Sequence, residues 1–282
     1  MSIIAVSGAM AAAVSDGTPR PKSGGLKLRI LSAAVMLPVA VGATWLGGWF
    51  FAALIALAGV AMLWEWARLP GELAMNVVVT GSLALVAALY LCLSGDFGWS
   101  AVLIALAAVV VGFLQRHRFV WHAAGFIYIG LPCIVLLWLR EIPDHGLLVV
   151  FWLLVVVWAT DIGAYAAGRT IGGPKLIPAI SPNKTWAGLF GGMLSAGIAG
   201  GLLALIDPRL PSLPLAVFGA LLAVVAQAGD FTESAVKRRF GVKDSSHLIP
   251  GHGGVLDRVD GLLFAAPVLA LALLLWRDRL WM

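Results

Sequence analysis

Uninterrupted apolar stretches dominate the chain, and each is long enough to cross a lipid bilayer. A transmembrane helix needs about 20 apolar residues, and such stretches recur nine times along the sequence. Hydrophobic residues make up 61% of the chain and charged residues only 12%, whereas an average soluble domain has roughly 25% charged residues. Cys92 and Cys133 both lie in apolar runs, so they form no disulfide framework. A soluble globular enzyme, a disordered protein and a secreted disulfide scaffold are therefore excluded.

The pattern predicts an all-α, polytopic integral membrane protein with about nine transmembrane helices. The apolar stretch from Ile30 to Trp64 is too long for one span, and Gly47-Gly48 supplies the turn that divides it. The expected spans are residues 29–46, 49–67, 76–93, 99–114, 124–140, 147–168, 186–206, 214–236 and 261–276.

The distribution of cationic residues predicts the orientation. With nine spans and a cytoplasmic N-terminus, 15 of the 19 Lys and Arg residues lie on the cytoplasmic side, as the positive-inside rule requires. Eight or ten spans would lose part of this separation. The net charge of +5 thus follows from membrane topology, and we expect no nucleic-acid partner.

Two loops expected on the cytoplasmic side, residues 169–185 and 237–260, are long and rich in Pro, Gly, Ser and cations. We expect the chemistry there. In the first 150 residues, the carboxylate that stands out beside the membrane is Glu65, which is flanked by tryptophans and Arg68. This setting is typical of an interfacial anchor, so we expect that role for Glu65.

Carboxylates also lie inside or at the ends of apolar segments. Asp161 interrupts an apolar run, and Asp230 and Glu233 lie in the eighth span. An ionised carboxylate at a helix centre costs about 2.5–3.5 kcal/mol, so cationic or metal partners are expected. The alternatives are a hydrogen bond between helices for Asp161 and an i,i+4 ion pair of Glu233 with Lys237.

The pattern around Asp230 favours a divalent cation. The helical face that begins at Asp230 continues through Glu233, Ser234 and Lys237. Asp230 has no cation near it on this helix, and carboxylate oxygens are the ligands that Mg²⁺ recruits. Asp257 and Asp260 stand one turn apart at the start of the last span, as metal ligands or as helix caps worth about 1 kcal/mol.

The loop 169–185 has the composition of a phosphate site. Lys184 lies between Asn183 and Thr185 at a helix start, where cations, hydroxyls and free amides suit an anion. For Lys175, non-specific contact with lipid headgroups is an equally good interpretation. The sequence has no Walker loop and no dinucleotide fingerprint, no zinc-ligand spacing among its five histidines, and no nucleophile elbow.

One C-terminal segment resembles the signature of phosphatidate cytidylyltransferases, also called CDP-diacylglycerol synthases. It reads Ser234-x-x-Lys237-Arg238, then Lys243-Asp244, then Pro250-x-His252-Gly253-Gly254-x-x-Asp257-Arg258-x-Asp260. Two upstream segments look like further motifs of that family: Asp161-x-Gly163-Ala164-Tyr165 with Gly168-Arg169, and Ile180-Ser181-Pro182-Asn183-Lys184-Thr185. Ile162 stands where the family usually has Thr. The resemblance is concentrated in residues 150–265.

This resemblance implies that the chain transfers the cytidylyl group of CTP to phosphatidic acid in phospholipid biosynthesis, giving CDP-diacylglycerol and pyrophosphate. It also implies a Mg²⁺ cofactor, a homodimer and a place in the inner membrane with the active site facing the cytoplasm. The lipid phosphate is already ionised and is itself the nucleophile. We therefore expect in-line attack on the α-phosphorus, assisted by positioning and charge.

The resemblance and the residue pattern together assign roles. The expected metal ligands are Asp230, Asp257 and Asp260. The expected catalytic residues are Asp161, Lys237, Asp244, His252 and Arg258. The expected substrate-binding residues are Ser181, Asn183, Lys184, Ser234, Arg238 and Lys243. The chain then divides into a flexible cytoplasmic arm (1–28), N-terminal transmembrane helices (29–146) and a C-terminal catalytic region (147–282).

Two other functions remain open at this point. A CTP-dependent kinase acting on a polyprenol or another lipid alcohol needs a base for its hydroxyl nucleophile. A secondary transporter of a phosphorylated solute is expected to show interrupted helices in two halves, whereas the polar residues here crowd into the last 125 positions.

Overall fold

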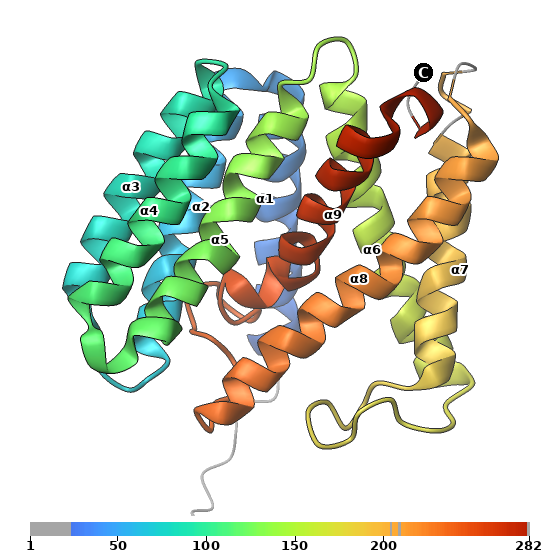
Figure 1. Cartoon of the computed structure of the whole chain (residues 1–282). Coiled ribbons are helices and arrows are strands. Elements are labelled where there is room, and N and C mark those ends of the chain that lie inside the picture. Colours follow the sequence, from blue (N-terminus) through green and yellow to red (C-terminus); the bar gives the residue numbers. More distant parts are fainter. Residues whose placement is uncertain (1–23, 204, 208–209, 281–282) are drawn as a thin grey trace, which may run out of the picture.

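A computed structural model describes residues 24–203, 205–207 and 210–280 of the chain. This part of the chain forms nine α-helices and one short 3₁₀ helix, packed into a single bundle (Figure 1). The helices are α1 (Gly24–Leu46), α2 (Gly48–Arg68), α3 (Met75–Leu93), α4 (Phe97–Leu114), η1 (Arg116–Arg118), α5 (Phe119–Arg140), α6 (Gly146–Thr170), α7 (Trp186–Leu203), α8 (Ser212–Arg239) and α9 (Leu256–Leu280). The described residues contain no β-strand, so the all-α prediction is confirmed.

Eight of the described helices, α2 to α9, are long and apolar enough to cross a membrane. In α1 the described apolar stretch is shorter, Ile30–Leu46. The chain is therefore a multi-pass membrane protein, while the count of nine spans and the cytoplasmic N-terminus stay predictions. Residues 1–23 of the predicted flexible arm lie outside the described residues, and residues 24–28 belong to helix α1 instead.

The turn between α1 and α2 shows why the long apolar stretch divides where predicted. Gly47 and Gly48 both have positive φ, 65° and 50°, which glycine adopts without strain. The Arg140 guanidinium donates to the carbonyls of Thr44 (2.6 Å) and Trp45 (3.0 Å) at the end of α1. A cation there complements the helix dipole. The turn is thus tied to the end of α5.

Helices α6 and α7 pack backbone to backbone through glycines. A Cβ added at Gly163 would lie 2.6 Å from the carbonyl oxygen of Gly191, and one at Gly192 would lie 3.0 Å from that of Thr160. Small residues drive such close contacts between membrane helices. This contact fixes the position of Asp161, which lies in α6 beside the crossing.

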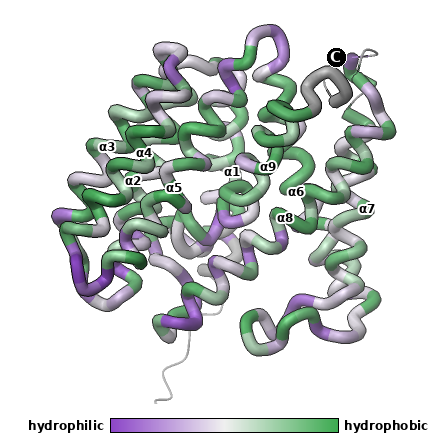
Figure 2. The backbone as a smooth tube through the Cα atoms, viewed as in Figure 1, coloured by the Kyte–Doolittle hydropathy of each residue, from purple (hydrophilic) through white to green (hydrophobic). Residues whose placement is uncertain are grey.

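The polar connections gather at one end of the bundle. The loops 171–185 and 240–255 leave the helices at the lower end in Figure 1, and the connections α1–α2, α3–α4 and α5–α6 lie at the upper end. Hydrophilic residues mark these ends, and hydrophobic residues cover most of the helices between them (Figure 2). The two loops in which chemistry is predicted therefore lie at the same end of the bundle.

We expect single cysteines at Ala179 and His247 to be labelled from one side of the membrane, and a single cysteine at Ser94 from the other. All three positions are exposed, whereas the native Cys92 and Cys133 are buried. A membrane-impermeant maleimide applied to spheroplasts and to inverted vesicles measures this. Labelling of the Ala179→Cys and Ser94→Cys variants from the same side would contradict the topology.

Candidate active site

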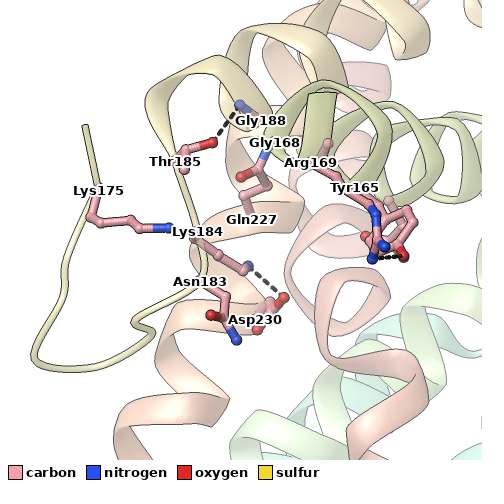
Figure 3. Close-up of a pocket in the computed structure, with 12 residues that line it drawn as sticks. Tyr165, Gly168, Arg169, Lys175, Asn183, Lys184, Thr185, Gly188, Gln227 and Asp230 are labelled. Carbon is pink, nitrogen blue, oxygen red and sulfur yellow. Dashed lines mark hydrogen bonds and ion pairs between the residues drawn. The ribbon is translucent and has the colours of Figure 1, made fainter. Parts of the chain in front are cut away.

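A cavity of about 580 Å³ opens between α6, α7, α8 and the loop 171–185 (Figure 3). Its volume falls within the range of small-molecule sites, roughly 300–1,000 Å³. The residues that line it are Asp161, Ala164, Tyr165, Gly168, Arg169, Lys175, Asn183, Lys184, Thr185, Gly188, Gln227 and Asp230. Four of the predicted site residues, Asp161, Asn183, Lys184 and Asp230, thus meet in one place although they come from three separate segments.

The loop 171–185 folds back on itself and brings two lysines to the cavity. Lys175 and Thr185 form an isolated antiparallel bridge, and the Leu176 amide donates to the Lys184 carbonyl at 3.0 Å. Thr185 then caps helix α7, since its hydroxyl accepts the Gly188 amide at 3.0 Å. The turn and the cap together hold Lys175 and Lys184 beside the cavity (Figure 3).

Lys184 forms an ion pair with Asp230 across the cavity. The helix α8 offers Asp230 no cation, and the partner comes from the loop. The Lys184 ammonium also lies 4.6 Å from the ring centre of Phe231, within cation–π range. The Ser234 hydroxyl donates to Asp230 at 3.3 Å. Substrate binding was predicted for Ser234, whereas in this geometry its hydroxyl supports a carboxylate.

Helices α8 and α9 touch where two predicted metal ligands stand. A Cβ added at Gly229 would lie only 2.5 Å from the Asp260 carbonyl oxygen. Asp260 interacts electrostatically with Asp230 and Asp161, and Arg258 interacts with Asp161. Within the described ranges no three His, Cys, Asp or Glu side chains form a preformed metal site.

Asp257 has a different environment from Asp230 and Asp260. One of its oxygens accepts from the Lys237 ammonium at 2.6 Å. The other accepts from the Ser245 amide (3.0 Å), the Ser245 hydroxyl (2.9 Å) and the Gly254 amide (2.7 Å). Its side chain is only 3% exposed. The contact with Gly254 is a helix-capping interaction, which was the alternative to metal binding for this residue.

Lys237 is held by two carboxylates, Asp257 and Glu233. The i,i+4 ion pair with Glu233 is the interaction expected from the sequence. All three side chains are largely buried, with 13% exposure for Lys237. Burial of charge is costly unless the groups are paired, so this cluster is stable only as a unit.

Glu65 is not an interfacial anchor, and that prediction is wrong. Its side chain lies in the last turn of α2 and is completely buried. It accepts hydrogen bonds from the amides of Val255 and Leu256, both at 2.8 Å, and from the Ser246 hydroxyl at 2.7 Å. The N-terminal helices therefore contribute directly to the loop that carries the signature.

The model of the cytidylyltransferase family matches residues 27–276 of the chain. The chain belongs to this family. A phosphatidate cytidylyltransferase of Brucella suis is 41% identical over 250 residues, which cover 87% of this chain and 92% of the relative. One of Pseudomonas aeruginosa is 39% identical over 89% of this chain and 97% of the relative. One of Bacillus subtilis is 40% identical over 182 residues, which cover 62% of this chain and 66% of the relative.

Several predicted site residues of this cytidylyltransferase lie away from the cavity lining. Ser181 is half-buried in the loop, Arg238 donates to the Val242 carbonyl at 3.3 Å, and Lys243, Asp244 and Arg258 are exposed. His252 is half-buried, and its Nδ1 is buried without a hydrogen-bond partner. The structure thus separates the predicted site residues into those that line the cavity and those outside its lining, most of which shape or follow the loop 240–255.

Sequence reasoning missed Gln227, which lines the cavity one turn before Asp230. Its side chain is buried, and its Nε2 has no hydrogen-bond partner. The signal that could have identified Gln227 is its polar amide, which stands in an otherwise apolar span. An unpaired buried donor costs free energy, so Gln227 is suited to donate to an oxygen of a bound substrate.

We expect Gly229→Ala to reduce both stability and activity, because the added methyl group pushes α8 away from α9 at Asp260. Overpacking of this kind costs roughly 1–3 kcal/mol. Gly42→Ala in α1 is the matched control, since nothing lies within 4 Å of its added Cβ. Thermal unfolding in detergent, together with turnover, measures both variants. A Gly229→Ala protein with unchanged melting temperature and turnover would contradict the close α8–α9 contact.

Proposed function

We propose that this chain is a phosphatidate cytidylyltransferase, which converts CTP and phosphatidic acid to CDP-diacylglycerol and pyrophosphate at the membrane. The observation that carries this proposal is the cavity walled by membrane helices, in which Lys184 and Asp230 stand side by side. A cation next to a carboxylate suits the phosphates of a nucleotide with its metal ion. The position among spanning helices suits a substrate whose acyl chains stay in the bilayer.

The reaction needs little acid–base chemistry from the protein. An oxygen of the phosphatidate phosphate forms a bond to the α-phosphorus of CTP. The bond from that phosphorus to the oxygen bridging to the β-phosphate breaks, and pyrophosphate leaves with the electron pair. Because the nucleophile is already an anion, catalysis depends on positioning two anions and stabilising charge. Lys175 and Lys184 at the cavity supply positive charge for this purpose.

The carboxylates near the cavity fit Mg²⁺. Proteins commonly hold this ion with one or two carboxylates and complete its ligand shell with substrate phosphates and water. Asp230 and Asp260 would hold it, with Asp161 close by to add negative charge. When bound, the ion neutralises the phosphate oxygens of the nucleotide. Asp257 has protein partners on both oxygens, which favours a role in holding Lys237 over metal binding.

The proposed location is the inner membrane, with the cavity on the cytoplasmic side. The lysines of the loop 171–185 and the cations at the end of α8 lie at the same end of the bundle, as the positive-inside rule requires of a cytoplasmic face. CTP reaches the cavity from that side. The homodimer implied by the resemblance stays a prediction, and light scattering coupled to size exclusion measures it.

We expect the purified protein to incorporate the label of α-³²P-CTP into a chloroform-soluble product when phosphatidic acid and Mg²⁺ are present. Label from γ-³²P-CTP should appear only in pyrophosphate. A lipid-alcohol kinase would instead transfer the γ-label to the lipid. Absence of α-label in lipid under these conditions, with a folded and monodisperse protein, would contradict the proposal.

We expect Asp230→Asn and Asp257→Asn to lose activity for different physical reasons. An amide is a weaker Mg²⁺ ligand than a carboxylate, so the defect of Asp230→Asn should decrease as the Mg²⁺ concentration rises. The defect of Asp257→Asn should not decrease, because the lost interaction is the charge opposite Lys237. Turnover over a Mg²⁺ titration measures this, with the exposed Asp96→Asn as a control. Recovery of Asp257→Asn by Mg²⁺, but not of Asp230→Asn, would reverse the two roles.

A further inference from the structure

Glu65 and the start of α9 form a contact between two distant parts of the chain. Glu65 lies in α2, and its hydrogen-bond donors lie 180–191 residues later. One oxygen, Oε1, accepts from the Ser246 hydroxyl and the Val255 amide. The other, Oε2, accepts from the Leu256 amide and lies 3.3 Å from the Ser245 hydroxyl, whose single proton it shares with Asp257. Both oxygens are therefore fully used by the loop 240–255 and the first residue of α9.

The Glu65 contact depends on uncharged hydrogen-bond donors rather than on an ion pair. Among the residues that the structure describes, no Lys, Arg or His forms an ion pair with Glu65, so its charge is balanced by backbone amides, hydroxyls and the positive end of the α9 dipole. A buried carboxylate without these donors would be strongly unfavourable. Glu65 therefore favours one conformation of the loop, the one in which the Val255 and Leu256 amides and the Ser246 hydroxyl point at it and the Ser245 hydroxyl lies between it and Asp257.

The Glu65 contact leads directly to the Lys237 cluster. The Ser245 hydroxyl lies within hydrogen-bond distance of both Glu65 and Asp257, and Asp257 holds Lys237. Gly254 lies between the two carboxylates, where an added Cβ would collide with Ser245 and Glu65. A displacement of the loop away from α2 would thus move Asp257 relative to Lys237.

We propose that Glu65 is a positioning residue for cytidylyl transfer, which ties the signature loop to α2 and so keeps Asp257 against Lys237. This inference rests on the proposed function for its kinetic consequence, and on the contacts alone for its structural consequence. Glu65 lies outside the signature and outside the C-terminal region that the sequence marks as catalytic. The N-terminal helices would then be part of the catalytic apparatus rather than only a membrane anchor.

The test compares Glu65→Gln with two other variants. Glutamine has nearly the same shape, but its amide nitrogen would face a donor that now binds a carboxylate oxygen. Ser246→Ala removes one of the four donors and keeps the charge. Ser100→Ala is the matched control, because it breaks a buried hydrogen bond between α4 and α3, to the Ala88 carbonyl at 2.7 Å, away from the loop.

Hydrogen exchange by mass spectrometry and steady-state kinetics are measured on the same detergent-purified full-length proteins. In Glu65→Gln we expect at least tenfold faster exchange in peptides covering residues 245–256, unchanged exchange in α3 to α5, and at least tenfold lower kcat. Ser246→Ala should show smaller changes of the same kind. Ser100→Ala should leave the exchange of the loop and kcat within twofold of the wild type.

The outcomes separate the two proposals. Wild-type kcat in Glu65→Gln, or loop exchange equal to that of the wild type, would overturn the positioning role. A uniform rise in exchange over all helices would mean general destabilisation and would overturn it as well. If Glu65→Gln does not fold, Ser246→Ala with unchanged loop exchange and unchanged kcat overturns it. Absence of cytidylyl transfer in the wild type itself would contradict the proposed function, while the exchange data would still test the contact.

Discussion

The start of helix α9 is the point on which the site depends. The first amides of a helix have no partner within the helix, and in a bundle that excludes water they need other acceptors. Glu65 accepts the amide of Leu256, the first residue of α9, and two carboxylates accept the amides just before it: Glu65 that of Val255 and Asp257 that of Gly254. Because these bonds fix where α9 begins, they also fix where Asp260 meets α8.

Close contacts between helices then bring the polar side chains of the site together. At Gly229 the backbone of α8 touches that of α9, and at Gly163 the backbone of α6 touches that of α7. The polar residues next to these contacts, Asp230, Asp260 and Asp161, are brought together because no larger side chain keeps the helices apart. In a membrane interior the hydrophobic effect does not drive helices together, so packing of this kind determines the geometry.

The fold was largely predictable from the sequence, and the site only in part. Apolar spans are readable because bilayer thickness fixes their length, and the pairing of Lys184 with Asp230 agrees with the expectation that a carboxylate in a spanning helix has a cationic partner. Glu65 was misassigned because its neighbours along the chain, tryptophans and Arg68, are those of an interface, whereas its true partners are about 180 residues away. The local sequence shows which face of a helix is polar or apolar, but it does not show which segment packs against that face.

The same distinction explains how the predicted site residues divide. A phosphate nucleophile that is already ionised needs no strong base, so few side chains must touch the reacting atoms. Two long anionic substrates, however, must be held in one orientation, and this requires a rigid loop. Asp257, Ser245 and Gly254 build that loop through hydrogen bonds and close packing, whereas Asp230 and Lys184 face the cavity. Glu65 and Asp257 thus serve the structure of the loop, because a loop amide that water cannot reach requires an acceptor from the protein.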